Sequence, residues 1–200
     1  MTLCGSFADF TIDCDNLMKG GTEQDIIIVD YDDVRAELAE GTPGITFDGT
    51  TKSLVTDFTF TASSDREGYL IEGSKGTVIG MSEAIDQNSG VGYKHSVEFQ
   101  IQDNLAASDY IVSQLKNKRI VVIFKNRHKN ASGAGKYKIL GLESGLVLES
   151  SNLNTSENNG VHMLKFSSEE ISLEPHPIWS LFDTDEATTD AIWTALQTAA

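Results

Sequence analysis

The strongest constraint on the fold is the recurrence of short, strand-like runs through the middle of the chain. Residues 25–31 (DIIIVDY) form a continuous run of β-branched apolar residues, which is typical of a strand buried on both faces. Residues 93–102 instead alternate, with His95, Val97 and Phe99 on one face and polar side chains on the other. We therefore expect His95 to be a packed or hydrogen-bonded sheet residue rather than a ligand.

Similar runs predict further strands and two helices. The strands are expected at 53–62, 68–72, 76–81, 119–125, 137–142, 146–150 and 161–167. One helix is expected at 104–117 and an alanine-rich one at 184–199, with acidic residues in its first turn. The predicted fold is mainly β with some α, an antiparallel β-sandwich or barrel. The 200 residues contain three prolines and no long linker, which indicates a single domain.

Charge is distributed unevenly along the sequence. Residues 116–138 hold eight basic and no acidic side chains, whereas the other 177 residues carry a net charge of −23. The eight are Lys116, Lys118, Arg119, Lys125, Arg127, Lys129, Lys136 and Lys138. Because charges are screened over about 8 Å at physiological salt, each pole presents its own potential. We expect this segment to form a basic hairpin that projects from the domain, with its tip at the glycines of residues 133–135.

Three roles are open for the basic hairpin. It could be solvated and protect a sheet edge, dock onto an acidic surface, or bind nucleic acid. Only Phe124 and Tyr137 are available to stack on bases, and the acidic remainder repels phosphates. Docking between subunits is therefore the favoured role, because patches of opposite sign allow head-to-tail assembly. The predicted interface residues are Lys118, Arg119, Lys125, Arg127, Lys129 and Lys136, with Trp179, Phe182 and Trp193 expected to dock a partner.

Signatures of catalysis, cofactor binding and membrane insertion are missing from the sequence. There is no GxSxG, P-loop, GxGxxG or HExxH motif, and the four histidines lack metal-ligand spacing. Asp30, Asp32 and Asp33 could hold Ca²⁺, but the EF-hand glycine and glutamate are absent, and a solvated strand end is the expectation. We predict no enzyme activity, no cofactor and no metal. No apolar run reaches the roughly 20 residues of a membrane helix, and the first residues do not form a secretory signal. Cys4 and Cys14 are expected to be free thiols.

The order of several segments resembles virion structural proteins of tailed phages that infect Bacteroidetes, including crAss-like phages. The segments that carry the resemblance are residues 25–33 (DIIIVDYDD), 69–73 (YLIEG), 92–101 (GYKHSVEFQI), 119–126 (RIVVIFKN), 137–168 and an acidic-Pro stretch near Glu174 and Pro175. The GLESGL stretch at 141–146 and the NNG at 158–160 are the most distinctive of them. The C-terminal helix is not part of the pattern.

The resemblance implies a tail-tube-like protomer of a tail or neck, assembled into a homo-oligomeric ring or tube through which DNA passes. Its expected partners are other tail, portal or neck proteins, its expected location is the virion, and no membrane partner is expected. Two alternatives remain open. One is a β-sandwich module that binds carbohydrate or another small ligand through Trp179, Tyr69 and loop acids. The other is an accessory protein that contacts DNA through the basic hairpin.

Overall fold

The computed structural model describes residues 21–40, 44–60, 66–73, 77–87, 90–101, 106–153 and 161–198, and in them it confirms a mainly β fold. The elements are β1 (Thr22–Asp30), α1 (Tyr31–Leu38), β2 (Ile45–Phe47), β3 (Leu54–Phe58), β4 (Gly68–Ile71), β5 (Ile79–Gln87), β6 (Gly90–Ile101), α2 (Ala106–Leu115), β7 (Ile120–Asn126), β8 (Tyr137–Leu140), β9 (Val147–Leu153), β10 (His162–Ser167), β11 (Trp179–Leu181) and α3 (Glu186–Thr198). Most of the predicted strands and both predicted helices are present. The sequence did not predict α1, β2 or β11.

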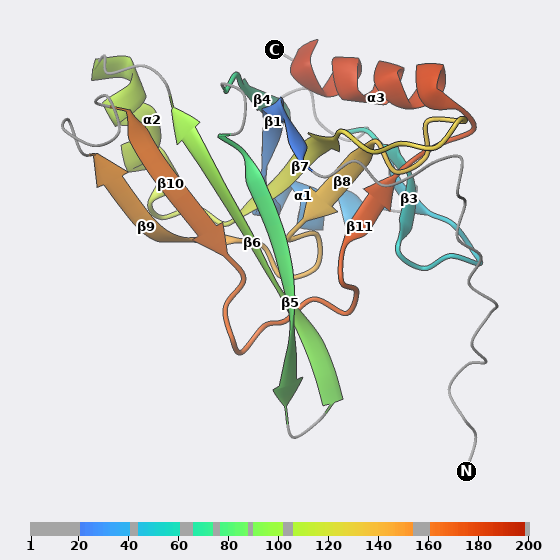
Figure 1. Ribbon diagram of the computed structural model, residues 1–200, viewed down its shortest axis with the longest axis horizontal. Coiled ribbons are helices and arrows are strands. Elements are labelled where there is room, and N and C mark those ends of the chain that lie inside the picture. Colours follow the sequence, from blue (N-terminus) through green and yellow to red (C-terminus); the bar gives the residue numbers. More distant parts are fainter. Residues whose placement is uncertain are drawn as a thin grey trace.

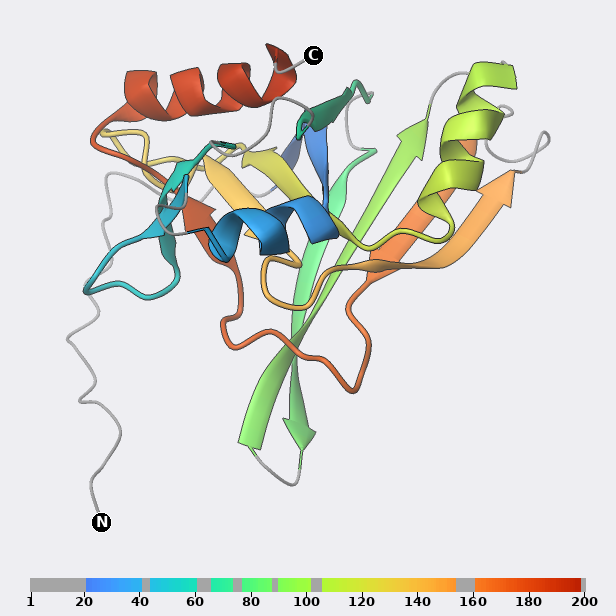
Figure 2. The ribbon, with the colours of Figure 1, turned by 180° about the vertical axis from the view of Figure 1, so that it is seen from behind.

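The strands form two curved sheets (Figures 1 and 2). A seven-stranded sheet has the order β2-β3-β11-β8-β7-β1-β4, and a four-stranded sheet has the order β5-β6-β10-β9. All strand pairs are antiparallel except β11 with β3. Sheets that pack face to face bury the side chains of their inner faces between them, so this arrangement is a sandwich with additional helices.

Strand β1 lies inside the seven-stranded sheet and is buried on both faces, as its continuous apolar run predicted. Ile27 and Val29 belong to a core shared with α1 and α3, whereas Ile26 and Ile28 belong to the core between the two sheets. Helix α3 lies across one face of the seven-stranded sheet (Figure 1). The larger sheet is therefore covered by helices on one side and by the smaller sheet on the other.

The core between the two sheets contains a stacked pair of aromatic rings, and α2 packs against it. Phe99 of β6 and Phe166 of β10 stack with ring centroids 5.7 Å apart. Val112 of α2 packs against the same core, and Asp109 Oδ1 of α2 lies 2.8 Å from His162 Nε2 of β10. In the part of the chain that the structure describes, no helix has both the length and the apolar character to span a membrane.

The hairpin that extends from the body is β5–β6 (Figures 1 and 2). Its strands pair over nine positions, from Ile79 opposite Glu98 to Gln87 opposite Gly90. The basic segment at 116–138 instead forms β7 and β8 near the middle of the larger sheet, and the loop between them lies along α3 (Figure 1). An ideal Cβ at Gly133, in this loop, would lie 2.5 Å from Glu186 Cβ of α3. The basic loop is thus packed against the body.

Candidate functional site

Four residues of the basic segment pair with carboxylates of the same chain. Lys118 Nζ lies 2.5 Å from Asp30 Oδ2, and Arg119 Nη2 lies 2.5 Å from Glu169 Oε2. Lys129 and Lys136 both reach α3, where their Nζ atoms lie 2.6 Å and 2.9 Å from Glu186 Oε1. The bipolar charge pattern of the sequence is therefore partly compensated within one molecule. The predicted role of these residues in a subunit interface stays a prediction.

Lys136 and Tyr137 fix α3 to the sheet through Asp190. Lys136 Nζ and the Tyr137 hydroxyl each donate to Asp190 Oδ1 over 2.7 Å. Burial raises the pKa of Tyr137 above its ordinary value, and its hydrogen bond to Asp190 raises it further. Although burial alone lowers the pKa of Lys136, hydrogen bonds to Asp190 and Glu186 raise it overall. Lys136 therefore stays protonated and the Tyr137 hydroxyl stays a donor across the physiological pH range, and their bonds to Asp190 hold one end of the basic segment on α3.

The remaining basic residues have no ion pair among the described residues. Lys125 Nζ lies 4.5 Å above the centre of the Trp193 ring, in a cation–π arrangement. Lys116 and Arg127 are exposed. Lys138 is partly buried and donates to Ser180 Oγ over 2.8 Å, and burial lowers its pKa.

The aromatic residues predicted to dock a partner lie mostly inside this chain. Trp179 and Trp193 are 3% and 4% exposed and belong to the core beneath α3, while Phe182 is half-buried. The Trp193 ring packs on Tyr137 with centroids 5.2 Å apart. As a correction to the sequence prediction, the two tryptophans fill the chain's own core. A large aromatic residue near an amphipathic helix can fill the chain's own core or dock a partner, and the sequence does not distinguish these two roles.

A buried polar network that the sequence did not reveal holds the GLESGL loop, residues 141–146. The carboxylate of Glu174, which is 0% exposed, accepts from Ser144 N over 2.9 Å and from Trp179 Nε1 over 2.9 Å. His95 is also fully buried, and its Nδ1 accepts from Gly141 N over 3.2 Å. Its Nε2 lies 3.0 Å from the carbonyl oxygens of residues 176 and 177. The expectation that His95 is a hydrogen-bonded sheet residue is confirmed.

The acidic cluster at the end of β1 has a structural role. Asp30 is the N-cap of α1, because its Oδ1 accepts from Asp32 N over 3.0 Å. Asp32 and Asp33 lie in the first turn of this helix, where the helix dipole favours negative charge. In the part of the chain that the structure describes, no three His, Cys, Asp or Glu residues are grouped so that they could hold a metal ion. Cys4 and Cys14 lie outside the described residues.

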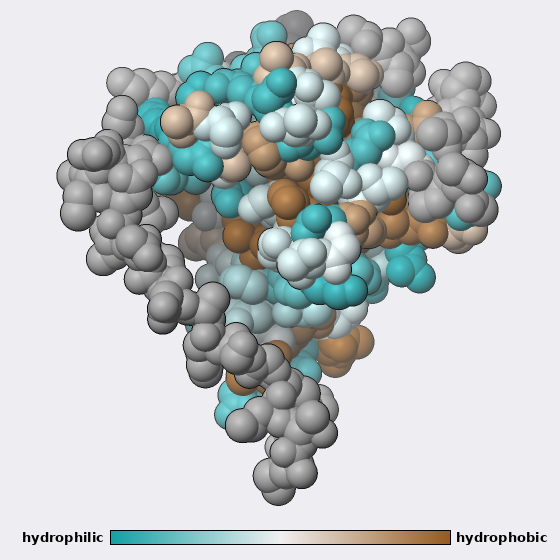
Figure 3. Space-filling view, turned by 90° about the vertical axis from the view of Figure 1, so that its right-hand side faces the viewer, coloured by the Kyte–Doolittle hydropathy of each residue, from teal (hydrophilic) through white to brown (hydrophobic). Residues whose placement is uncertain are grey.

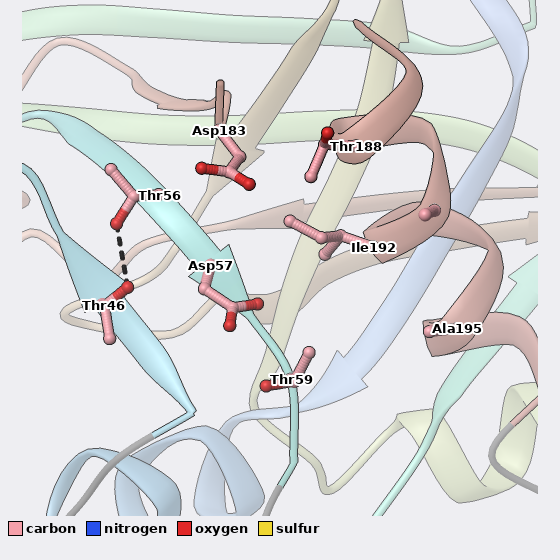
Figure 4. A pocket seen from close by; sticks show the side chains of 9 residues that line it. Thr46, Thr56, Asp57, Thr59, Asp183, Thr188, Ile192 and Ala195 are labelled. Atoms are coloured by element: carbon pink, nitrogen blue, oxygen red, sulfur yellow. Dashed lines mark hydrogen bonds between the residues drawn. The ribbon is translucent and has the colours of Figure 1, made fainter. Parts of the chain in front are cut away.

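A polar groove of about 430 Å³ lies between β3 and α3. Figure 3 shows the side of the molecule that carries β3, β11 and the start of α3, where hydrophilic and hydrophobic side chains are interspersed. In Figure 4, Asp57 and Asp183 lie near threonine hydroxyls, with Ile192 of α3 across the groove. Oδ1 of Asp57 is buried without a hydrogen-bond partner among the described residues, and burial, aided by the charge of Asp183, raises its pKa. The groove is thus lined by two acidic side chains and no basic one.

Among the described residues, each outer strand of the four-stranded sheet pairs with one strand alone, β5 with β6 and β9 with β10, so its other edge is open there. On β5, Ile79 and Met81 are 47% and 40% exposed, and on β9, Leu153 is 45% exposed. Ile79, Met81 and Ile85 alternate along β5 and therefore share one face. Edge strands of monomeric proteins usually carry charges, prolines or bulges that block further pairing. β5 has Glu83 and Asp86 and no proline, so its proximal half is available to another strand.

Comparisons of the chain with protein-family models, with curated proteins and with solved structures find no match.

Proposed function

We propose that this protein is a non-enzymatic structural subunit that assembles head to tail into a ring or tube. The observation that carries the proposal is the four-stranded sheet with an open edge strand at each end, β5 on one side and β9 on the other. β5 also belongs to the hairpin that extends beyond the body of the molecule (Figure 1). A two-stranded hairpin is only marginally stable by itself in water, so a partner would stabilise its extended part.

Pairing of β5 from one copy with β9 of the next would continue the same sheet from subunit to subunit. The main-chain groups at the two edges supply the hydrogen bonds of such a contact, as in other cases of strand addition. Because β5 and β9 are different surfaces, the contact is heterologous. Heterologous contacts produce rings when the rotation closes and helical filaments when it does not.

The exposed apolar side chains at both edges support this choice of surface. Met81 of β5 and Leu153 of β9 would be removed from water by the pairing. Apolar burial contributes roughly 25 cal/mol for each Å².

We further propose that the ring belongs to the tail or neck of a tailed-phage virion and that DNA passes through it. The support is the sequence resemblance and the net charge of −15, since an acidic wall does not release counterions from DNA and so does not retain it. The basic residues would contribute as a secondary contact to a neighbour's acids, chiefly through Lys116 and Arg127, which have no ion pair among the described residues.

The two alternative functions receive less support. A carbohydrate-binding module would use exposed aromatic rings, and of the two named for that role Trp179 is 3% exposed while Tyr69 is 56% exposed. A DNA-contacting protein would use free basic side chains, and four of the eight pair with carboxylates.

The proposal is tested by mass photometry and negative-stain imaging over a range of protein concentrations. We expect rings or tubes from the wild type and monomers from the double variant Met81→Lys/Ile85→Lys, which places two charges on the edge strand. Tyr110→Lys/Ile111→Lys is the matched control, because it adds the same charge at residues of α2 that are 65% and 43% exposed. A wild type that stays monomeric at all concentrations, or loss of assembly in the control alone, would contradict the proposal.

A further inference from the structure

A second hollow, of about 490 Å³, lies between the two sheets, where the first residues of β1 and β5 meet β7 and β8. Its polar lining includes Asn126, Arg127 and Lys138. No acidic side chain is among its lining residues. This hollow is therefore opposite in character to the aspartate-lined groove beneath α3.

Lys138 is the central feature of the hollow. It lies opposite Phe124 of β7 and Ser180 of β11 in the strand register, so all three residues share the face that looks toward the smaller sheet. Its Nζ donates to Ser180 Oγ over 2.8 Å, and it forms no ion pair with any described carboxylate. An ammonium group has three donors, so two remain for water or a ligand. A partly buried cation without a counter-charge is unfavourable, and a bound anion removes that penalty.

Arg127 places a second positive charge at the same hollow. Its backbone N donates to Gly21 O over 3.1 Å, which anchors the residue beside the start of β1. The side chain runs along Gly21, with Nη1 3.6 Å from the ideal Cβ position of that glycine. Arg127 also has no described carboxylate partner. A guanidinium presents its donors as a planar fork that matches a carboxylate.

The rest of the hollow is apolar. Val78, just before β5, belongs to the same buried core as Phe124 of β7, and Ile178 packs against that core. β5 can approach Phe124 only because residue 80 is glycine, since an ideal Cβ there would lie 2.7 Å from Phe124 Cζ. A hollow of this size, with apolar walls and a few polar groups at one end, is typical of a small-molecule site.

We propose that this hollow binds a small organic carboxylate with an apolar body. The carboxylate would lie between Lys138 Nζ and the Arg127 guanidinium, and the apolar part would lie on Phe124 and Ile178. A hydrated inorganic anion would leave the apolar walls unused, and a neutral apolar molecule would leave Lys138 without a counter-charge. The inference does not depend on the assembly proposed above, because Lys138 and Arg127, which would bind the carboxylate, lie on neither β5 nor β9.

The test is a titration of the ¹³C-methyl-labelled protein with phenylacetate, followed by NMR. We expect saturable shifts confined to the methyl groups of Val78 and Ile178. 2-Phenylethanol, which has the same ring without the charge, should bind at least about tenfold more weakly, since a hydrogen bond between charged groups contributes about 1.5–3 kcal/mol. Inorganic phosphate should compete poorly.

Lys138→Met is the diagnostic variant. It keeps the length of the side chain and removes a partly buried charge, so the variant should fold with undiminished stability. It should bind phenylacetate at least about tenfold more weakly than the wild type. Arg127→Gln should weaken binding by a smaller factor. Lys116→Met, an exposed position outside the hollow, should leave it unchanged. Absence of saturable shifts, equal binding of 2-phenylethanol, stronger binding of phosphate, or unchanged binding by Lys138→Met would each overturn the proposal.

Discussion

Trp179 donates its indole N–H to Oε2 of Glu174 over 2.9 Å, inside the chain and only five residues away. The same carboxylate accepts the backbone N–H groups of Glu143 and Ser144. One buried acid thus ties β11, the core beneath α3 and the GLESGL loop together. The backbone of Glu174 also pairs with that of Tyr93 in β6, which attaches the loop 169–178 to the four-stranded sheet.

We predict that Glu174→Gln lowers the free energy of unfolding by about 1–3 kcal/mol, because the amide nitrogen turns toward donors and leaves at least one of them unpaired. Denaturant unfolding followed by tryptophan fluorescence measures the change. Glu143→Gln is the matched control, since its exposed side chain accepts none of these bonds, and it should change the free energy by less than about 0.5 kcal/mol. Equal effects of the two substitutions would show that the network does not stabilise the fold.

His95 predicts a pH dependence of stability. Burial lowers its pKa below the ordinary value of 6.5, and the nearby charge of Glu174 offsets only part of this effect. The unfolded state therefore binds more protons than the folded state below about pH 6.5, and stability falls as the pH falls through that value. We expect the wild type to lose stability between pH 7 and pH 5 more steeply than His95→Gln. Parallel pH profiles of the two proteins would contradict this assignment.

The attachment of α3 depends on Asp190 more than on the exposed lysine pair. Asp190→Ala removes the acceptor of the Tyr137 hydroxyl, leaves Lys136 with Glu186 alone, and should lower the free energy of unfolding by about 1–3 kcal/mol. Lys129→Ala removes only the bridge between side chains that are 46% and 32% exposed, and should change it by about 1 kcal/mol at most. Hydrogen exchange of the α3 amides should rise in the first variant only. Comparable exchange in both would show that the hydrogen bonds to Asp190 are not what holds the helix.

The secondary role of the basic residues has its own test. Lys116→Glu/Arg127→Glu breaks no ion pair among the described residues, so the monomer should stay folded. We expect assembly of this variant to need a several-fold higher concentration at low salt, and the difference to shrink at high salt because exposed charges are screened. Mass photometry at two ionic strengths gives the comparison. If the variant assembles like the wild type at low salt, basic docking contributes nothing.

Local patterns in the sequence predicted the strands because apolar side chains recur along a strand wherever one or both of its faces are buried. The apolar run at Ile26–Val29 is buried on both faces, and His95 lies on the inner face of β6 with Val97 and Phe99. The alanine-rich segment forms α3 as expected.

Relationships between distant segments could not be read in the same way. No local pattern indicates that Lys129 and Lys136 contact Glu186, which lies 57 and 50 residues later in the chain, so the segment 116–138 was predicted to project from the domain. Helix α1 was missed because its N-cap, Asp30, looked like the solvated end of a strand. The choice of β5–β6 as the extended hairpin depends on where the body of the fold ends, which no local pattern specifies.

The most direct test of head-to-tail assembly is cross-linking between single cysteines on the two edge strands. In a background with Cys4→Ser and Cys14→Ser, Met81→Cys on β5 and Asn152→Cys on β9 are introduced singly and together, and the assembled protein is treated with a short bismaleimide. Head-to-tail assembly predicts a ladder of covalent oligomers from the double variant, dimers from a mixture of the two single variants, and monomers from each single variant alone. Dimers from Met81→Cys alone would indicate a two-fold contact between β5 strands and would contradict it, as would monomers from the double variant.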